Sequence, residues 1–316
     1  QMRPDRLILS YPVITSGEIL SYVPGSRDFC QIESIQAFNI DSTNIPPHHW
    51  LTITRTIREH YEAYDGFVIT HGTDTMAYTA AALSYLIQHS PKPIVITGAQ
   101  KPIDMENTDA RTNLMDSLRF AACPRAHDVN IVFDGKVIAG TRGKKERTKS
   151  YNAFSSINFP CIAIIQEEHI LFYLDDKERM PGSPVFYSEL NPNVGLLKLI
   201  PSMDASLLDY MAERYDAVIV ESFGVGGLPS YENGDYHRAV ARWTSLGKTV
   251  IMTTQVTNEG SNMSVYEVGR NIKKEFGLLE AYDMTLEAAV TKIMWILGQT
   301  RRPEEIRALF YQTINR

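Results

Sequence analysis

The sequence lacks long apolar runs, a cysteine framework and an excess of basic charge. No apolar stretch in the 316 residues approaches the roughly 20 residues needed to cross a bilayer, and the N-terminus lacks the apolar core of a signal peptide. The three cysteines, Cys30, Cys123 and Cys161, are too sparse for a disulfide scaffold and fit a reducing compartment. The net charge is −6, whereas a protein that binds nucleic acid generally needs a basic surface. We therefore expect a cytoplasmic protein that contacts neither nucleic acid nor membrane.

Several signatures of metal, nucleotide and nucleophile sites are also missing. The sequence contains no HExxH motif and no His/Cys/Asp cluster with metal-ligand spacing, so no metal site is expected. It has neither a Walker A motif nor a GxSxG nucleophile elbow. The run GVGG at residues 224–227 fails the dinucleotide fingerprint, because Pro229 stands where the third glycine should be. We interpret that run as a loop packed between two domains.

What is present is the composition and rhythm of a globular α/β protein. Apolar residues make up 44% of the chain and charged residues 22%, both near globular averages. Short apolar runs alternate with helical patterns, which predicts a mostly parallel sheet with helices on both faces. The expected strands are residues 6–9, 33–40, 66–70, 94–97 and 130–133, and the expected helices are residues 46–61, 75–88 and 108–122. The dipeptide Asp134-Gly135 predicts a hairpin after the last of these strands.

The rhythm is interrupted once, which predicts two domains. Residues 175–193 are charged, rich in proline and aperiodic, as is typical of a linker. After them we expect strands at residues 194–199, 217–220 and 249–253, and helices at residues 205–214, 236–245, 285–297 and 303–311. We predict a larger N-terminal α/β domain at residues 1–180 with most of the active site, a linker at residues 181–193, and a smaller Rossmann-like α/β domain at residues 194–316.

The run THGTDTM at residues 70–76 lies where a buried strand ends and a helix begins. Ligands of open α/β sheets bind at the carboxyl ends of strands, and free N–H groups at a helix start attract carboxylates. Two hydroxyls and a carboxylate at this place are suited to a small zwitterion. Helix capping explains the same residues equally well, since Thr and Asp are common N-cap residues.

Two further stretches are candidate parts of a site. The run TGAQ at residues 97–100 ends the next buried strand, and its small residues allow a ligand to approach the backbone, although a plain turn has the same composition. Residues 141–149, TRGKKERTK, are dense in charge and typical of a solvated loop. One lysine of this loop turning inward would supply positive charge or act as a base.

The run HGTDTM resembles the second signature of the bacterial-type L-asparaginase family. Residues 65–86 around it are very similar to the cytoplasmic, type I branch of that family. Further matches follow the family's order: Asp41-Ser42-Thr43 with Trp50, residues 93–100, Lys145 nine residues before Phe154, SFGVG at residues 222–226 and TTQ at residues 253–255. The resemblance covers nearly the whole chain.

The resemblance implies hydrolysis of L-asparagine to L-aspartate and ammonia, without a cofactor. The family uses a threonine hydroxyl as nucleophile and forms an acyl-enzyme that water then cleaves. A threonine hydroxyl is a weak nucleophile until a base takes its proton. Members are homo-oligomers, so a homodimer or tetramer is implied. Action on L-glutamine, which is longer by one methylene, depends on the size of the pocket.

The resemblance also implies which side chains form the site. It assigns Thr73, Asp74 and Lys145 to one catalytic group, in which Lys145 holds or accepts the proton. Asp74 is implied to pair with the α-ammonium of the substrate. Ser42, with the backbone near Thr43, is implied to receive the α-carboxylate.

Two backbone groups complete the implied site. The carbonyl of Ala99 is implied to contact the side-chain amide of the substrate. The carbonyl of that amide needs hydrogen-bond donors for its developing negative charge. The N–H of Thr73 is our hypothesis for such a donor.

One signature of the family is missing. The family's Thr-Gly-Gly-Thr-Ile carries the nucleophile directly after the first strand, and a mobile lid with a tyrosine follows. Here the strand expected at residues 6–9 runs into residues 11–20, which in the family lie beyond the lid. Either the segment is deleted, or the sequence as written leaves out a disordered lid. We favour the second explanation, which expects Cα atoms of Ser10 and Tyr11 much farther apart than the ~3.8 Å of bonded neighbours.

Two other functions stay open. The asparaginase-like subunit of an archaeal tRNA-dependent amidotransferase shares HGTDTM but carries an extra N-terminal domain, which this sequence does not contain. A binding protein that holds an amino acid without turnover would require the deletion to be real. A copurifying partner subunit would favour the first alternative, and saturable binding without ammonia release would favour the second.

Overall fold

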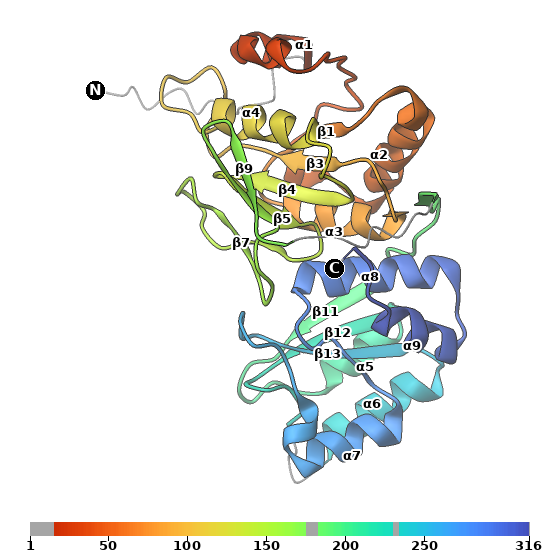
Figure 1. Cartoon of the computed structure of the whole chain (residues 1–316). Helices are drawn as coiled ribbons and strands as arrows, with labels where there is room; N and C mark the ends of the chain where they lie inside the picture. Colours follow the sequence, from red (N-terminus) through yellow and green to blue (C-terminus); the bar gives the residue numbers. More distant parts are fainter. Residues whose placement is uncertain (1–15, 175–182, 230–233, 316) are drawn as a thin grey trace, which may run out of the picture.

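The computed structural model describes residues 16–174, 183–229 and 234–315. The chain folds into two α/β domains that lie one above the other (Figure 1). The expected strand at residues 6–9 and the Ser10–Tyr11 bond lie outside the described residues. None of the helices in the described ranges is long and apolar enough to cross a membrane.

The sheet of the N-terminal domain is mixed. Its order is β1-β3-β4-β5-β8-β9, in which the first three strands are parallel and the others antiparallel. The strands are β1 (Phe67–Thr70), β3 (Ile94–Thr97), β4 (Val129–Phe133), β5 (Lys136–Ala139), β8 (Ala163–Gln166) and β9 (His169–Phe172). Parallel pairing stops at β4 because Asp134 and Gly135, both with positive φ, turn the chain straight back as a hairpin.

Helices cover both faces of this sheet. The helices are α2 (Pro47–His60), α3 (Met76–Leu86) and α4 (Ala110–Ala121). Alternate residues of a strand point to opposite faces, and β3 shows this directly. Ile94 and Ile96 pack in the core formed with α2 and α3, whereas Val95 packs with Phe120 of α4.

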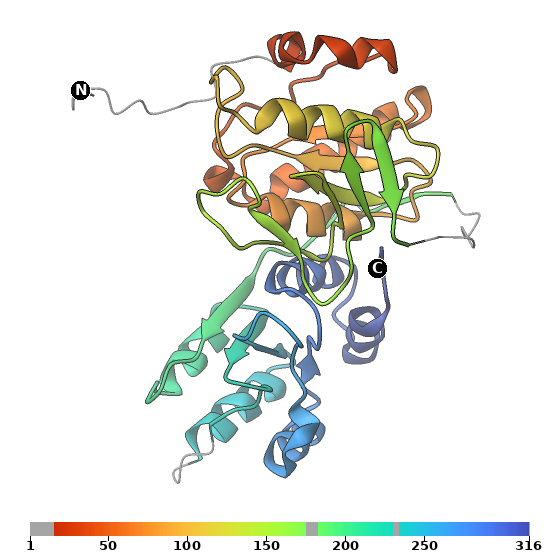
Figure 2. The same cartoon turned by 60° about the vertical axis from the view of Figure 1, so that its left-hand side comes forward.

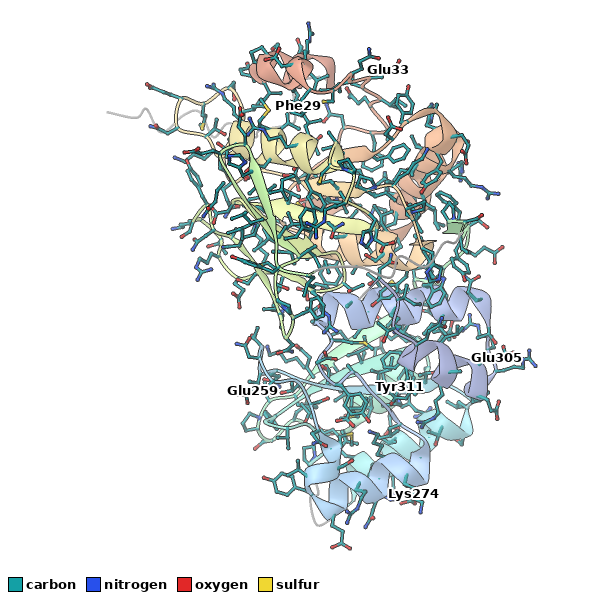
Figure 3. All side chains as sticks on the ribbon, in the orientation of Figure 1. Phe29, Glu33, Glu259, Lys274, Glu305 and Tyr311 are labelled. Carbon is teal, nitrogen blue, oxygen red and sulfur yellow. The ribbon has the colours of Figure 1, made fainter. Side chains whose placement is uncertain are left out.

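The C-terminal domain has a parallel sheet of order β11-β12-β13-β14. Its strands are β11 (Val194–Lys198), β12 (Ala217–Ser222), β13 (Thr249–Thr254) and β14 (Leu279–Glu280), and its helices are α5 (Ser206–Ala212), α6 (Asp235–Ser245), α7 (Glu267–Phe276), α8 (Leu286–Gln299) and α9 (Pro303–Tyr311). Val218 and Val220 face the core with α5 and α6, and Ile219 faces α8 and α9. Tyr311 of α9, which Figure 3 labels, accepts a hydrogen bond at 3.0 Å from the N–H of Glu280.

The two domains share one hydrophobic core. Helix α3 of the upper domain packs on α8 of the lower one, and α8 lies between the two sheets in both views (Figures 1 and 2). Tyr85 of α3 stacks on Trp295 of α8, with 6.1 Å between ring centroids. Because α3 is covered by its own sheet on one side and by α8 on the other, nearly all of its residues are buried.

Short elements connect these layers. They are α1 (Ser16–Ile19), β2 (Ile87–Gln88), β6 (Gly143–Lys145), β7 (Phe154–Ser156), β10 (Val185–Phe186) and the 3-10 turns Leu20–Tyr22, Pro24–Asp28, Ser42–Asn44, Tyr61–Ala63 and Met263–Val265. Strand β10 pairs with β2, so the chain leaving residues 175–182, which are not described, is fastened to the N-terminal domain. The boundaries of the predicted linker and domains stay a prediction.

One local expectation is wrong, and two elements were not expected. Residues 33–40 form no strand, because they run along the surface without pairing with any described strand. Helix α7 and strand β14 were not anticipated from the sequence. Helix α7 ends at Gly277, whose left-handed conformation terminates it directly before β14.

Burial of Asp116 in α4 predicts a pH-dependent stability. Burial raises the pKa of Asp116 to about 6, although the nearby Arg119 lowers it. The folded protein therefore keeps a proton that the unfolded chain loses above about pH 4, so the free energy of unfolding falls as the pH rises from 4 to 6. The variant Asp116→Asn should be more stable than the parent by roughly 1–3 kcal/mol at pH 7.5 and nearly equal at pH 4. Urea unfolding at the two pH values measures this, and an equal difference at both would contradict it.

Candidate active site

The carboxyl ends of the parallel strands β1 and β3 meet at one edge of the N-terminal sheet. The chain turns away from both strands there, and the N–H of His71 donates to the carbonyl of Thr97 at 2.8 Å. A Cβ atom at Gly98 would lie 2.2 Å from the carbonyl oxygen of His71. Only glycine at position 98 allows the two strand ends to approach this closely.

Three of the predicted site side chains are in direct contact. Lys145, from β6, places its Nζ 2.6 Å from Oδ1 of Asp74 and 2.7 Å from Oγ1 of Thr73. Thr73 and Asp74 belong to the loop between β1 and α3. The side chain of Lys145 is only 17% exposed, whereas that of Asp74 is 59% exposed. The site therefore presents a carboxylate to solvent, with an ammonium and a hydroxyl behind it.

The neighbouring lysine faces another way. Nζ of Lys144 lies 3.6 Å from Oε1 of Glu287, a buried residue at the start of α8. Alternate residues of a strand point to opposite sides, so of these two lysines of β6 only Lys145 reaches the loop after β1.

Gln100 completes the environment of the Thr73 hydroxyl; the sequence analysis included it in the run TGAQ but gave it no role. The Thr73 hydroxyl donates to Oε1 of Gln100 at 3.1 Å. Nε2 of Gln100 donates to the carbonyls of Arg147 and Ser150 at 3.3 and 3.1 Å, which fixes the orientation of the amide. Thr73 therefore accepts a hydrogen bond from Lys145 and directs its own proton to Gln100.

Ser42 lies against the loop after β1. A Cβ atom at Gly72 would be 2.6 Å from Oγ of Ser42, so the contact depends on glycine. The hydroxyl of Thr75 donates to the carbonyl of Ser42 at 2.7 Å and holds it there. Thr43 has both its N–H and its hydroxyl bonded to the carboxylate of Asp41, and these bonds lower the pKa of Asp41.

Ala99 lies in the turn after β3, half-buried between Gly98 and Gln100. Helix α4 holds this turn from behind. The carboxylate of Asp109 accepts from the N–H of Gln100 at 2.9 Å, and Nδ2 of Asn113 donates to the carbonyl of Gly98 at 2.9 Å. The predicted site residues thus lie on three neighbouring segments, together with Lys145: the turn at Ser42, the loop after β1 and the turn after β3.

The glycine-rich run at residues 224–227 forms a tight turn that is held by hydrogen bonds within the C-terminal domain. Gly224, Gly226 and Gly227 all have positive φ, and the Ser222 hydroxyl donates to the carbonyl of Gly227. In addition, the Thr254 hydroxyl donates to the carbonyl of Gly224 at 2.5 Å. The carbonyls of Gly224 and Gly227 are therefore bonded to side chains of the same domain. In the part of the chain that the structure describes, no group of three or more His, Cys, Asp or Glu side chains is arranged to hold a metal ion.

The sequence and the fold are similar to those of known proteins. The family model "Asparaginase, N-terminal" matches residues 2–178, and the model "Glutaminase/Asparaginase C-terminal domain" matches residues 193–310. An L-asparaginase of Thermococcus kodakarensis is 40% identical over 309 residues, which are 97% of this chain and 92% of the relative.

Two further relatives are informative. The solved structure of the thermostable L-asparaginase from Thermococcus kodakarensis superposes with a TM-score of 0.90 at 39% identity, covering 95% of this chain and 90% of that one. A component of the glutamyl-tRNA(Gln) amidotransferase of Pyrococcus furiosus is 34% identical over 310 residues, 95% of this chain and 69% of that component. Since both domains match and the similarity extends over nearly the whole chain, this protein belongs to the asparaginase family.

Proposed function

We propose that this protein is an amidohydrolase that converts L-asparagine into L-aspartate and ammonia. The contact between Lys145, Thr73 and Asp74 carries the proposal, because it combines a proton carrier, a hydroxyl and a carboxylate at the end of β1. The membership in the asparaginase family and the L-asparaginase relative support the choice of substrate.

The substrate would be held through its charged α-groups. The carboxylate of Asp74 is more than half exposed and can pair with the α-ammonium while it keeps its bond to Lys145. The Ser42 hydroxyl would receive the α-carboxylate, and the N–H of Thr43 would join it only by giving up its bond to Asp41. This fixes the side-chain amide over Thr73 and Ala99, as positioning of a reactant requires.

Lys145 would move the proton. As an ammonium it donates to both Thr73 and Asp74, so before it can act as a base it must release one proton to solvent, by way of the exposed carboxylate of Asp74. As an amine it takes the proton of an attacking oxygen, either of a threonine hydroxyl or of the water that Thr73 positions. A C–O bond then forms, the C–N bond breaks, and Lys145 returns the proton to the departing nitrogen as ammonia leaves. If the oxygen belongs to threonine, water cleaves the resulting ester by the same exchange.

The proposal extends to the setting of the enzyme. Besides L-asparagine the reaction consumes only water, and it uses no cofactor. We place the enzyme in the cytoplasm, in keeping with its three unpaired thiols, as a homodimer or tetramer. L-glutamine would be a weaker substrate, since one additional methylene changes binding by only about 1–3 kcal/mol.

One observation favours a second candidate function. The family's first signature, with its nucleophilic threonine, is not in the sequence. If no other oxygen takes its place, the protein would bind asparagine or aspartate without turnover. The similarity to part of an amidotransferase supports a third, weaker candidate, which would need a partner subunit.

Ammonia release tests the proposal directly. The full chain should release ammonia from L-asparagine, and Lys145→Met should lower kcat by roughly 10²–10⁴-fold, because the variant has no group to carry the proton. Lys144→Met is the matched control and should keep kcat near that of the parent, since Lys144 faces Glu287. Saturable binding of asparagine by the parent without ammonia would instead establish the binding protein.

Adding a Cβ atom at Gly72, where the chain lies close to Ser42, should impair substrate binding. In Gly72→Ala the added Cβ overlaps Oγ and Cβ of Ser42, at 2.6 and 2.8 Å, and pushes the turn at Ser42 away from the site. We expect KM for L-asparagine to rise at least about tenfold, which corresponds to about 1.4 kcal/mol of lost binding. Steady-state kinetics measures this, with Ser42→Ala as a second variant that should raise KM without the overlap. An unchanged KM in both would remove Ser42 from the site.

A further inference from the structure

Two peptide groups border the Lys145–Thr73–Asp74 contact, and each is fastened at one end by a buried side chain. We infer that His71 and Asp109 are positioning residues: His71 aims the N–H of Thr73 at the amide oxygen of the substrate, and Asp109 aims the carbonyl of Ala99 at its amide nitrogen. This inference rests on the proposed amide hydrolysis and adds the residues that orient the backbone groups of that site.

A buried chain of hydrogen bonds fixes the tautomer of His71. Nε1 of Trp50 can only donate, and it donates to the Thr79 hydroxyl oxygen at 3.0 Å. The Thr79 hydroxyl in turn lies 2.9 Å from Nε2 of His71, and Nδ1 of His71 lies 2.6 Å from the carbonyl oxygen of Gly72. Because that carbonyl can only accept, Nδ1 carries the proton and Nε2 accepts from Thr79. Burial lowers the pKa of His71, which keeps the imidazole neutral.

The bond to Gly72 determines where the N–H of Thr73 points. The Gly72 carbonyl and the Thr73 N–H belong to one planar, trans peptide group and point in opposite directions. His71 holds the carbonyl end from inside the protein. Within the described residues, the Thr73 N–H donates to no acceptor. It is therefore a donor held ready for the oxygen on which negative charge develops.

Asp109 orients the peptide group after β3 in a similar way, but it holds the N–H end rather than the carbonyl end. Its carboxylate accepts from the N–H of Gln100 at 2.9 and 3.0 Å and from the N–H of Lys101 at 3.1 Å. The Gln100 N–H and the Ala99 carbonyl are two ends of one peptide group. Asp109 holds the N–H end from the α4 side, so the Ala99 carbonyl points the other way.

The two peptide groups are suited to opposite ends of an amide. The loops that carry them are joined by the bond from Thr73 to Gln100 and by the close approach at Gly98. An amide under attack needs a donor at its oxygen and an acceptor at its nitrogen, and the Thr73 N–H and the Ala99 carbonyl supply one of each. His71 and Asp109 are buried, only 9% and 7% exposed, so they act through these peptides and not on the substrate itself.

Thr79→Val tests the chain that ends at the Thr73 N–H. It keeps the shape of the side chain and removes the hydroxyl that fixes His71. Thr54→Val is the matched control: Thr54 is also buried, and its hydroxyl donates to the Trp50 carbonyl at 2.9 Å, away from the site. We expect Thr79→Val to lower kcat roughly tenfold to hundredfold with KM changed less than about threefold. Thr79→Ser should restore kcat.

Two substitutions at position 71 distinguish the effect of the hydrogen-bond donor from the effect of side-chain volume. His71→Asn keeps an N–H close to the position of Nδ1, whereas His71→Leu fills the space without a donor. The inference expects kcat of His71→Asn to exceed that of His71→Leu by roughly tenfold. Equal values of kcat in the two variants would show that the donor to the Gly72 carbonyl has no effect.

Asp109→Asn tests the second peptide. In asparagine one carboxylate oxygen becomes an NH2 group, which cannot accept the bonds that Oδ2 of Asp109 accepts from the N–H of Gln100 and from Nδ2 of Asn113. The repelled donors loosen the turn at Ala99, which loses its fixed orientation. Asp116→Asn, the same change at a similarly buried position of α4, is the control. We expect a loss of roughly tenfold or more in kcat for Asp109→Asn and none for Asp116→Asn.

The outcomes distinguish this inference from the proposed function. If Lys145→Met is inactive while Thr79→Val and Asp109→Asn keep kcat within about twofold of the parent, the site stands and the positioning roles are wrong. The roles are also wrong if the Thr79 and Thr54 variants lose equal thermal stability and equal kcat. If the parent releases no ammonia, the proposed function fails and the positioning roles fail with it. If Lys145→Met is fully active, the role of Lys145 as proton carrier fails, while the amide hydrolysis stands.

Discussion

The burial of helix α3 on almost every side is the constraint on which the molecule depends. Four of its 11 residues are alanine, and these small side chains allow the sheet on one side and α8 on the other to approach the helix closely. The loop that enters α3 carries Thr73 and Asp74, and Thr79 lies one turn inside it. A helix that cannot shift within its surroundings therefore fixes the position of the site relative to both domains.

The site itself combines a rigid interior with an exposed charge. Lys145 reaches it from a separate hairpin, and its ammonium joins β6 to the loop after β1 through Thr73 and Asp74. Behind it, Gln100 is held by backbone carbonyls and the turn after β3 by Asp109. Of these side chains, the Asp74 carboxylate faces largely outward. Such an arrangement pre-orients the groups that act on a ligand and leaves one charge available to attract it.

Local sequence patterns predicted most of the elements, because α3, β1, β3 and β12 are long or strongly apolar segments with clear starts. The segment at residues 33–40 was mistaken for a strand because a short run that contains apolar residues says nothing about whether a partner strand exists. The role of Gln100 and the whole contribution of Asp109 were missed for a related reason. Gln100 bonds to residues about fifty positions away, and Asp109 acts through backbone N–H groups, so neither leaves a pattern of side chains in the sequence. Only the resemblance to a family selected Lys145 from among its neighbours.

The shared core has a consequence for any attempt to divide the protein. Trp295 and Tyr85 belong to different domains yet stack on each other, and α8 covers a face of α3 that no part of the N-terminal sheet could cover. A fragment ending before β11 would expose the apolar face of α3, and the complementary fragment would expose the apolar face of α8. Two co-expressed halves would associate through these apolar faces, whereas either half alone would aggregate.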